Sequence, residues 1–236
     1  MIRIRIEGIG RTQRFLISAQ KQARFAAGVA LTKTARRLEM RLKAKVAAEL
    51  PSSTPYSRNS TFSTAARRDK LQAVVGIRDR KPGRGTAPAV LLKEHFAGGV
   101  RGNKPMEVAL AALGALPSGW RAVPGSGMPL DGYGNPRRTA VAEMLGSLKS
   151  GMQQYKGRGK RMALTGYFAI RPGTRSHLPP GVYWRKGRAL KAMMVFVKGA
   201  GYRKVIDLPE MARGVMAKEF AGHFRAAYRQ AVRTAR

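Results

Sequence analysis

Alternating apolar and polar residues predict strands in several parts of the chain. In residues 2–6 every second residue is Ile and the intervening ones are Arg, which is the period-2 pattern of a half-buried strand. Similar segments bounded by Gly or Pro predict strands over 71–77, 166–171, 182–185 and 190–197. The last of these is the most β-like stretch of the chain.

A long amphipathic helix is predicted near the N-terminus. From Ser18 to Leu50, apolar residues recur three and four positions apart, with Ser18 as the N-cap and Pro51 as the stop. At ~1.5 Å per residue this helix would span roughly 45–50 Å, more than a compact domain of this size needs. The sequence is equally consistent with a bend near Gly28.

The same spacing predicts three further helices. The C-terminal amphipathic helix follows Asp207-Leu-Pro-Glu210, which supplies a capping residue, a first-turn Pro and an early acid. Shorter helices are predicted over 105–116 and 139–155. Residues 89–96 are apolar and fit either a helix or a strand.

Gly, Pro and polar residues mark the connections between these elements. Long loops are expected at about 51–64, 78–88, 117–138 and 156–165. The order of elements predicts an α+β fold, with a mostly antiparallel sheet packed by the long N-terminal helix and the C-terminal amphipathic helix. The length fits a single domain over 1–236.

Charge changes this picture more than any other property. The chain of 236 residues carries 46 Lys and Arg against 12 Asp and Glu, a formal net charge of +34. Residues 144–206 hold fourteen Lys or Arg and no acid. This segment therefore needs acids from elsewhere in the chain, counterions, or an acidic partner such as nucleic acid or a protein face. The alternative is a solvated basic surface that only maintains solubility.

Two clusters of bases in this acid-free segment are candidate polyanion- or partner-binding sites. The first is a Gly-spaced loop, and the second follows Tyr183-Trp184, whose rings could stack on unpaired bases. The alternative for the two aromatics, which we favour, is a strand with one ring in the core. The candidate residues are Lys156, Arg158, Lys160, Arg161, Arg185, Lys186, Arg188 and Lys191.

No local motif indicates catalysis, a cofactor or a metal. The acids form no Asp-x-Asp or Glu-x-x-Glu pair, and the chain has no Cys. Glu94-His95 is the only neighbouring acid–His pair, and neighbouring side chains on a regular element point apart. An enzyme, such as a nuclease, is the least supported class, and no cofactor is expected. The apolar run 108–120 is too short for the ~20 residues that cross a bilayer.

Several short motifs resemble one known family in collinear order over nearly the whole chain. The chain resembles the tail-completion family of tailed bacteriophages, also called minor tail protein Z. The matching segments are Arg24-Phe-Ala-Ala-Gly-Val-Ala-Leu-Thr-Lys-Thr-Ala35, Ser53-Thr-Pro-Tyr-Ser-Arg-Asn-Ser60, Ala112-Leu-Gly-Ala-Leu-Pro-Ser-Gly-Trp120, Val123-Pro-Gly125, Leu130-Asp-Gly-Tyr-Gly-Asn135, Gly166-Tyr-Phe168, Leu178-Pro-Pro-Gly-Val-Tyr-Trp184 and Tyr202-Arg-Lys204.

The resemblance implies a non-enzymatic virion protein at the head-proximal end of a long tail. It implies a homo-oligomeric ring, expected to be a hexamer, in the neck between the tail terminator and the head-completion or connector proteins. Such a ring makes the tail competent to join the DNA-filled head. Assembly in the host cytoplasm, packaged DNA in the lumen and no membrane partner are then expected.

Apolar residues of the long and C-terminal helices are expected to form the contacts between copies of the chain. The residues expected at the ring interface are Leu31, Leu38, Leu42, Phe220 and Phe224. The alternative function is a basic nucleic-acid-binding protein that acts through phosphate contacts.

Overall fold

The computed structural model describes residues 9–67, 69–80, 83, 85–151, 153–156, 162–199 and 201–234, with the backbone alone at 9–17, 153–156, 162 and 163. By its contacts the chain divides into two compact units. Unit 1 combines Met1–Phe96 with Lys204–Arg236, and unit 2 is Ala97–Arg203. The sequence predicts a single domain over 1–236, whereas each of the two units has a hydrophobic core of its own. The strand expected at 2–6 lies outside the described residues.

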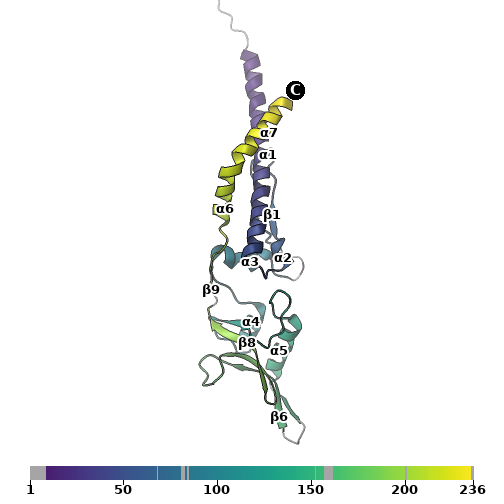
Figure 1. Cartoon of the computed structure of the whole chain (residues 1–236), viewed down its shortest axis with the longest axis vertical. Helices are drawn as coiled ribbons and strands as arrows, with labels where there is room; N and C mark the ends of the chain where they lie inside the picture. The colour runs from purple at the N-terminus through teal and green to yellow at the C-terminus, as the bar shows by residue number, and fades with distance from the viewer. Residues whose placement is uncertain are drawn as a thin grey trace, which may run out of the picture. The chain divides into compact units, whose positions relative to one another are not determined.

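Helix α1 (Ile9–Glu49) is the longest element of unit 1 and is continuous in Figure 1. It ends before Pro51, as predicted, but the expected start at Ser18 is wrong because the helix begins nine residues earlier. Between Gly10 and Gly28 the sequence contains no Gly or Pro that would break these turns. The helix also continues through Gly28. Its 41 residues correspond to a length of ~60 Å.

The C-terminal helix packs along α1. Helix α6 (Leu208–Val215) begins as predicted, with Asp207 Oδ1 accepting from the backbone N–H of Glu210 at 3.1 Å. A π-helical turn, η1 (Met216–Phe220), joins it to α7 (Ala221–Thr234). Figure 1 shows α7 running beside α1, and the two helices are in contact. Their buried small residues, which permit a close approach, are Ala26, Ala30, Ala227 and Ala231.

The core of unit 1 lies near the C-terminal end of α1. Leu42, Val46 and Ile206 are fully buried there, with side chains from β2 and α3 packed against them. Helix α3 (Pro88–Ala97) establishes that the ambiguous segment 89–96 is helical. The carbonyl of His95 accepts from the N–H groups of residues 205 and 206, which fixes the returning chain against α3.

The loop expected over 51–64 contains two short elements, α2 (Pro55–Arg58) and β1 (Thr61–Ser63). Strand β1 pairs antiparallel with β2 (Val75–Ile77), and both contact α1. The strand predicted over 71–77 is therefore confirmed only in its last three residues.

Unit 2 is built on a five-stranded antiparallel sheet. Its strands are β4 (Trp120–Pro124), β5 (Gln153–Lys156), β6 (Met162–Ile170), β7 (Gly181–Lys186) and β8 (Ala189–Lys198). Their order across the sheet is β4-β8-β7-β6-β5, so the four consecutive strands β5 to β8 form a meander and β4 pairs with the outer edge of β8. A separate pair joins β3 (Gly99–Val100) to β9 (Gly201–Tyr202).

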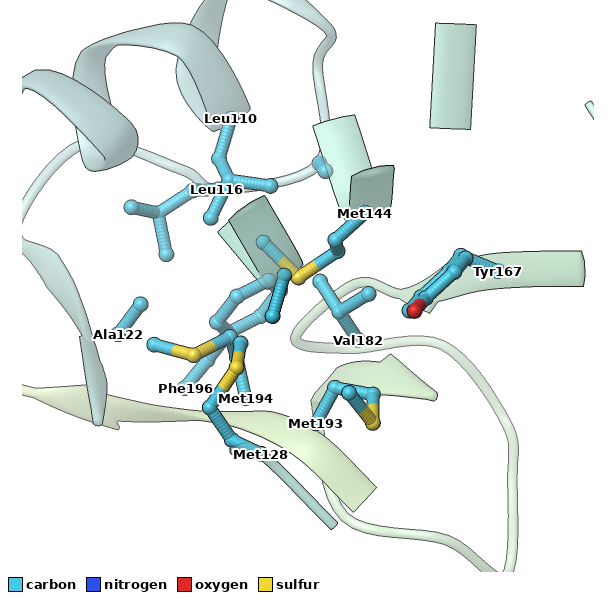
Figure 2. Close-up of a cluster of buried hydrophobic side chains, with 12 residues drawn as sticks. Leu110, Leu116, Ala122, Met128, Met144, Tyr167, Val182, Met193, Met194 and Phe196 are labelled. Carbon is cyan, nitrogen blue, oxygen red and sulfur yellow. The ribbon is translucent and has the colours of Figure 1, made fainter. Parts of the chain in front are cut away.

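Two helices bury one face of this sheet. Residues of α4 (Pro105–Ala112) and α5 (Arg138–Ser150) meet sheet residues in a single cluster, which Figure 2 shows around Leu110, Met144 and Phe196. Along β8, Met194 and Phe196 are buried whereas Val195 and Val197 are half-exposed, the alternation of a sheet covered on one face. Met193 is buried as well, because the register of β7 and β8 shifts at a β-bulge there.

The hydroxyl of Tyr167 on β6 ties α5 to the sheet. It donates to Glu143 Oε1 at 3.2 Å. Burial and the neighbouring Glu143 carboxylate raise the pKa of Tyr167 to about 12.

Several predicted boundaries in unit 2 are wrong for identifiable reasons. The helix expected over 139–155 ends at Ser150, because Gly151 adopts a φ of 77° and the chain then enters β5. The helix expected over 105–116 ends at Ala112, before Gly114 with a φ of 66°. The loop expected over 117–138 contains the edge strand β4, and residues 162–165 of the loop expected over 156–165 belong to β6.

The α+β class and the antiparallel sheet are confirmed. The helices expected against the sheet, α1 and α6–α7, pack with each other, and α1 also packs with the small β1–β2 sheet of unit 1. In unit 2, α4 and α5 supply the helical layer, which packs on residues of β4, β6, β7 and β8.

Candidate polyanion-binding site

The topology of unit 2 brings Lys156, from one predicted basic cluster, to the same end of the sheet as the other predicted cluster. Strand β7 ends at Lys186, which pairs with Ala189 across the β7–β8 turn and with Thr165 on β6. On the other side of β6, strand β5 ends at Lys156, paired with Met162. Because all these strands are antiparallel neighbours, the last residue of β5 and the β7–β8 turn lie at one sheet end. We call this end, with Lys156 and residues 185–191, the basic end.

The side chains of the β7–β8 hairpin are open to solvent. Arg185, Lys186, Arg188 and Lys191 are all exposed. Arg185 Nε donates to the carbonyl of Gly187 at 2.9 Å, which holds the guanidinium beside the turn. These four side chains therefore lie together on one exposed hairpin, and their role in binding a polyanion stays a prediction. Of the other cluster, only the backbone of Lys156 is described, and Arg158, Lys160 and Arg161 lie outside the described residues.

The basic end contains no acid of its own. Residues 144–206 contribute no Asp or Glu, and within the described part of the chain no ion pair involves the four hairpin bases. These side chains can therefore bind phosphate or carboxylate oxygens without first breaking an internal ion pair. Such contacts position a polyanion but do not recognise a base sequence.

The aromatic residues beside these bases belong to the sheet. Tyr183 is 4% exposed, stacks on Phe168 with ring centroids 5.7 Å apart, and donates its hydroxyl to the carbonyl of Pro179 at 2.8 Å. The prediction that one ring lies in the core is confirmed. Trp184 packs against the core, and Lys191 Nζ lies 5.8 Å from its ring centroid. The cation–π contact occupies a Trp184 face that base stacking would need.

Two of the five residues expected at an oligomer interface are internal to the chain. Leu42 is fully buried and Leu38 is 8% exposed, so neither side chain is available to a second copy. Their positions in the apolar stripe of α1 make them core residues of unit 1. Leu31 is half-buried and stays a candidate. Phe220 and Phe224 are also half-buried, with ring centroids 6.2 Å apart.

The acids and histidines of the described residues do not gather into a metal-binding group. No group of three His, Asp or Glu side chains with metal-ligand geometry occurs among them. Burial lowers the pKa of His95 on α3, and the adjacent Glu94 only partly opposes this effect. His223 Nε2 lies 3.7 Å from Glu219 Oε2 within the C-terminal helix.

Sequence reasoning missed two acids that organise the units. Glu219, in the π-helical turn, accepts from Arg41 Nη2 at 2.8 Å and from Arg37 Nε at 3.4 Å, which joins this turn to α1. The five-residue step from Val215 to Phe220 in the apolar stripe is a sequence signal for this turn.

The second acid is Glu107, which forms a buried pair with Arg101 in unit 2. Both carboxylate oxygens accept from the guanidinium at 2.6 Å. Glu107 also accepts from the N–H of Lys104 and from the N–H of Ala122 on the outer edge of β4, each at 2.8 Å. This last bond satisfies an N–H donor on the edge strand, which another strand could otherwise pair with.

Within the described residues, no helix is long and apolar enough to cross a membrane. No family model, curated protein or solved structure matches the chain.

Proposed function

We propose that this chain is a structural virion protein of a long-tailed bacteriophage. In this proposal it forms a ring at the head-proximal end of the tail and makes the tail competent to join the DNA-filled head. The collinear series of motifs shared with the tail-completion family carries the proposal.

The positions of two motif glycines support this reading of the motifs. A Cβ at Gly125 would lie 2.4 Å from the carbonyl oxygen of Ala192, and one at Gly181 would lie 2.3 Å from that of Met194. Both glycines therefore let neighbouring backbone pass close to β8. Motifs of this kind record the architecture of unit 2 rather than a catalytic site, as expected for a structural protein.

Electrostatics constrain how such a ring is built. Six copies at +34 each would bring together 204 formal positive charges. Screening over ~8 Å at physiological salt weakens this repulsion but does not remove it between close neighbours. We propose that the basic end faces a polyanion, either packaged DNA or an acidic neck protein. Leu31, Phe220 and Phe224 remain the candidate ring contacts.

Removal of the protein from an infection tests this function directly. A nonsense mutation early in its gene is expected to give DNA-filled heads and separate, full-length tails, both visible by negative-stain electron microscopy. Purified protein added to that lysate should restore joined particles. Infectious particles formed without the protein would contradict the proposal.

The oligomeric state tests the ring separately. Mass photometry of the purified protein should show a hexamer that is favoured by a polyanion and lost as salt rises. A hexamer that forms without any partner and is insensitive to salt would show that neutralisation by a polyanion is not required.

A second function, a basic nucleic-acid-binding protein, is favoured by the four exposed, acid-free bases of the β7–β8 hairpin. DNA binding in vitro does not separate the two functions, because a basic ring protein also binds DNA. The nonsense mutant does, since a protein that acts only on nucleic acid would leave head–tail joining intact.

A further inference from the structure

A basic hollow lies on α1 in unit 1, and none of its lining residues belongs to the basic end. Its volume is about 610 Å³, within the range of pockets that hold ligands of nucleotide size. One wall is a face of α1 that carries Arg24, Phe25, Lys33 and Arg36, and the opposite wall contains Arg67 and Asp69 from the segment between β1 and β2.

Hydrogen bonds fix the two walls relative to each other. Thr32 Oγ1 donates to the carbonyl of Gly28 on α1 at 2.8 Å and accepts from the N–H of Ala66 on the opposite wall at 3.0 Å. Gly28 also lines the hollow, and because it has no side chain it leaves this space open. The hollow is therefore a formed feature of unit 1 rather than a gap between independent segments.

The charge of the hollow favours an anion. Four bases line it against one acid, Asp69, which lies 3.4 Å from Arg67 with both side chains largely exposed. An exposed ion pair of this kind contributes little to stability, so a bound anion can readily replace Asp69 as the partner of Arg67. Lys33 and Arg36 are both exposed on the α1 wall.

An aromatic ring beside these bases narrows the class of anion. Phe25 is 40% exposed and lines the same hollow. A single-strand-binding surface has two parts. Lys and Arg side chains contact the phosphate backbone, and an aromatic side chain provides a face on which a nucleobase can stack. Duplex DNA keeps its bases stacked inside, and an acidic peptide has no base, so neither uses Phe25.

We infer that this hollow binds a short single-stranded segment of nucleic acid. Arg24, Lys33, Arg36 and Arg67 contact its phosphates, and one base stacks on Phe25. The inference does not require the ring or the virion function, because an isolated monomer contains the whole hollow.

Fluorescence anisotropy with a labelled single-stranded oligonucleotide tests this site. Phe25→Leu keeps an apolar side chain and the net charge but removes the ring, so it should weaken binding by about fivefold or more. Phe25→Trp should bind at least as tightly as the unsubstituted protein. Met40→Ala, an equally neutral change at an exposed residue of the same helix, should leave affinity unchanged.

Duplex DNA of the same length provides the second arm. Phe25→Leu should leave duplex affinity unchanged, whereas Arg36→Gln should reduce the salt slope of single-strand binding by about 0.7. Single-strand binding that is the same for Phe25→Leu and the unsubstituted protein would overturn the inference. Equal losses for single strand and duplex would do so too. A poly-glutamate peptide that competes as well as the oligonucleotide would show that an acidic peptide is the ligand instead.

Discussion

At the scale of single residues, the buried ion pair Arg101–Glu107 fixes the edge strand β4 of unit 2 to the start of α4. Glu107 is fully buried and accepts four hydrogen bonds, two from Arg101 and one each from residues 104 and 122. Burial alone raises the pKa of Glu107, but these bonds and the adjacent guanidinium outweigh it and hold the pKa below its ordinary value. The pair connects the start of α4 with β4.

Glu107→Gln should destabilise the protein by about 3 kcal/mol or more, because it leaves the buried Arg101 charge without its counterion. Urea-induced unfolding followed by circular dichroism measures this loss. The control is Glu49→Gln, which removes an acid from an exposed i,i+4 pair with Lys45 and should cost no more than about 0.5 kcal/mol. Equal costs for the two variants would mean that burial of the pair is not what stabilises it.

The stability that Glu107 contributes should also depend on pH. Because its folded pKa is depressed, the contribution is present above the unfolded pKa of about 4.3 and is lost as the pH falls through the lower folded value. The difference in unfolding free energy between the unsubstituted protein and Glu107→Gln should therefore shrink below about pH 4. A difference that stays constant down to pH 2 would contradict this assignment.

Substitution by Ala is expected to have opposite effects on stability at two glycines of unit 2. A Cβ at Gly181 would overlap the carbonyl oxygen of Met194, so Gly181→Ala should cost about 1–3 kcal/mol. Gly146 lies inside α5 with open space around it, so Gly146→Ala should stabilise the protein by up to about 1 kcal/mol. Thermal unfolding of both variants checks the pair, and a neutral Gly181→Ala would show that β7 and β8 are not so closely spaced.

At the scale of elements, the π-helical turn keeps the apolar residues of the C-terminal helix on one face. Val215 and Phe220 are five residues apart, whereas the steps on either side are three or four. A π-helical turn accommodates the extra residue and keeps both halves of the stripe facing the same way. Without it, either α6 or α7 would turn its apolar face away from α1.

Deletion of Ala217 from this turn should therefore be tolerated. It restores a four-residue step between Val215 and Phe220, so the unfolding free energy should change by less than about 1 kcal/mol. Deletion of Ala226 from α7 is the matched control, because it rotates Ala227 and Ala231 out of their buried positions and should cost about 2 kcal/mol or more. Equal losses in urea-induced unfolding would contradict this explanation of the turn.

The long periodic elements could be predicted from sequence, and the short ones could not. Helix α1, the start of α6 and strands β7 and β8 follow from stripes, caps and alternation that are local. Strand β4 was missed because its stability comes from pairing with β8 and from Glu107, both distant in sequence. Residues 71–74 of the predicted strand 71–77 are not part of a strand, because β1 provides only three residues with which β2 can pair.

At the scale of the whole molecule, the division into two units is not predicted from the sequence. Unit 1 combines both chain ends, so the chain crosses between units near 96 and again near 203. Glycines lie beside both crossings, at 98, 99 and 102 and at 199 and 201, but these stretches are too short to separate a unit boundary from an ordinary turn. The β7–β8 part of the basic end could be predicted, because its four bases are close in sequence. The hollow on α1 could not, because Arg67 meets Arg36 only through the fold.

The basic end predicts a specific change in duplex-DNA binding. Replacement of the four exposed bases of the β7–β8 hairpin by Ala should lower the salt slope by about 3–4 if each contacts one phosphate. The control replaces four exposed bases of the C-terminal helix, Arg213, Lys218, Arg225 and Arg229, and keeps the same net charge as the test variant. Equal slopes for the two variants, measured by fluorescence anisotropy across a salt series, would mean that binding is diffuse rather than located at this end.

The most direct test of the proposed virion function is cryo-electron microscopy of intact particles, with images classified at the neck. The map should contain a closed ring of this chain between the tail and the head connector, with the β7–β8 hairpin facing DNA or an acidic protein. A neck in which this chain is missing, or in which the hairpin faces bulk solvent with no polyanion nearby, would contradict the proposal.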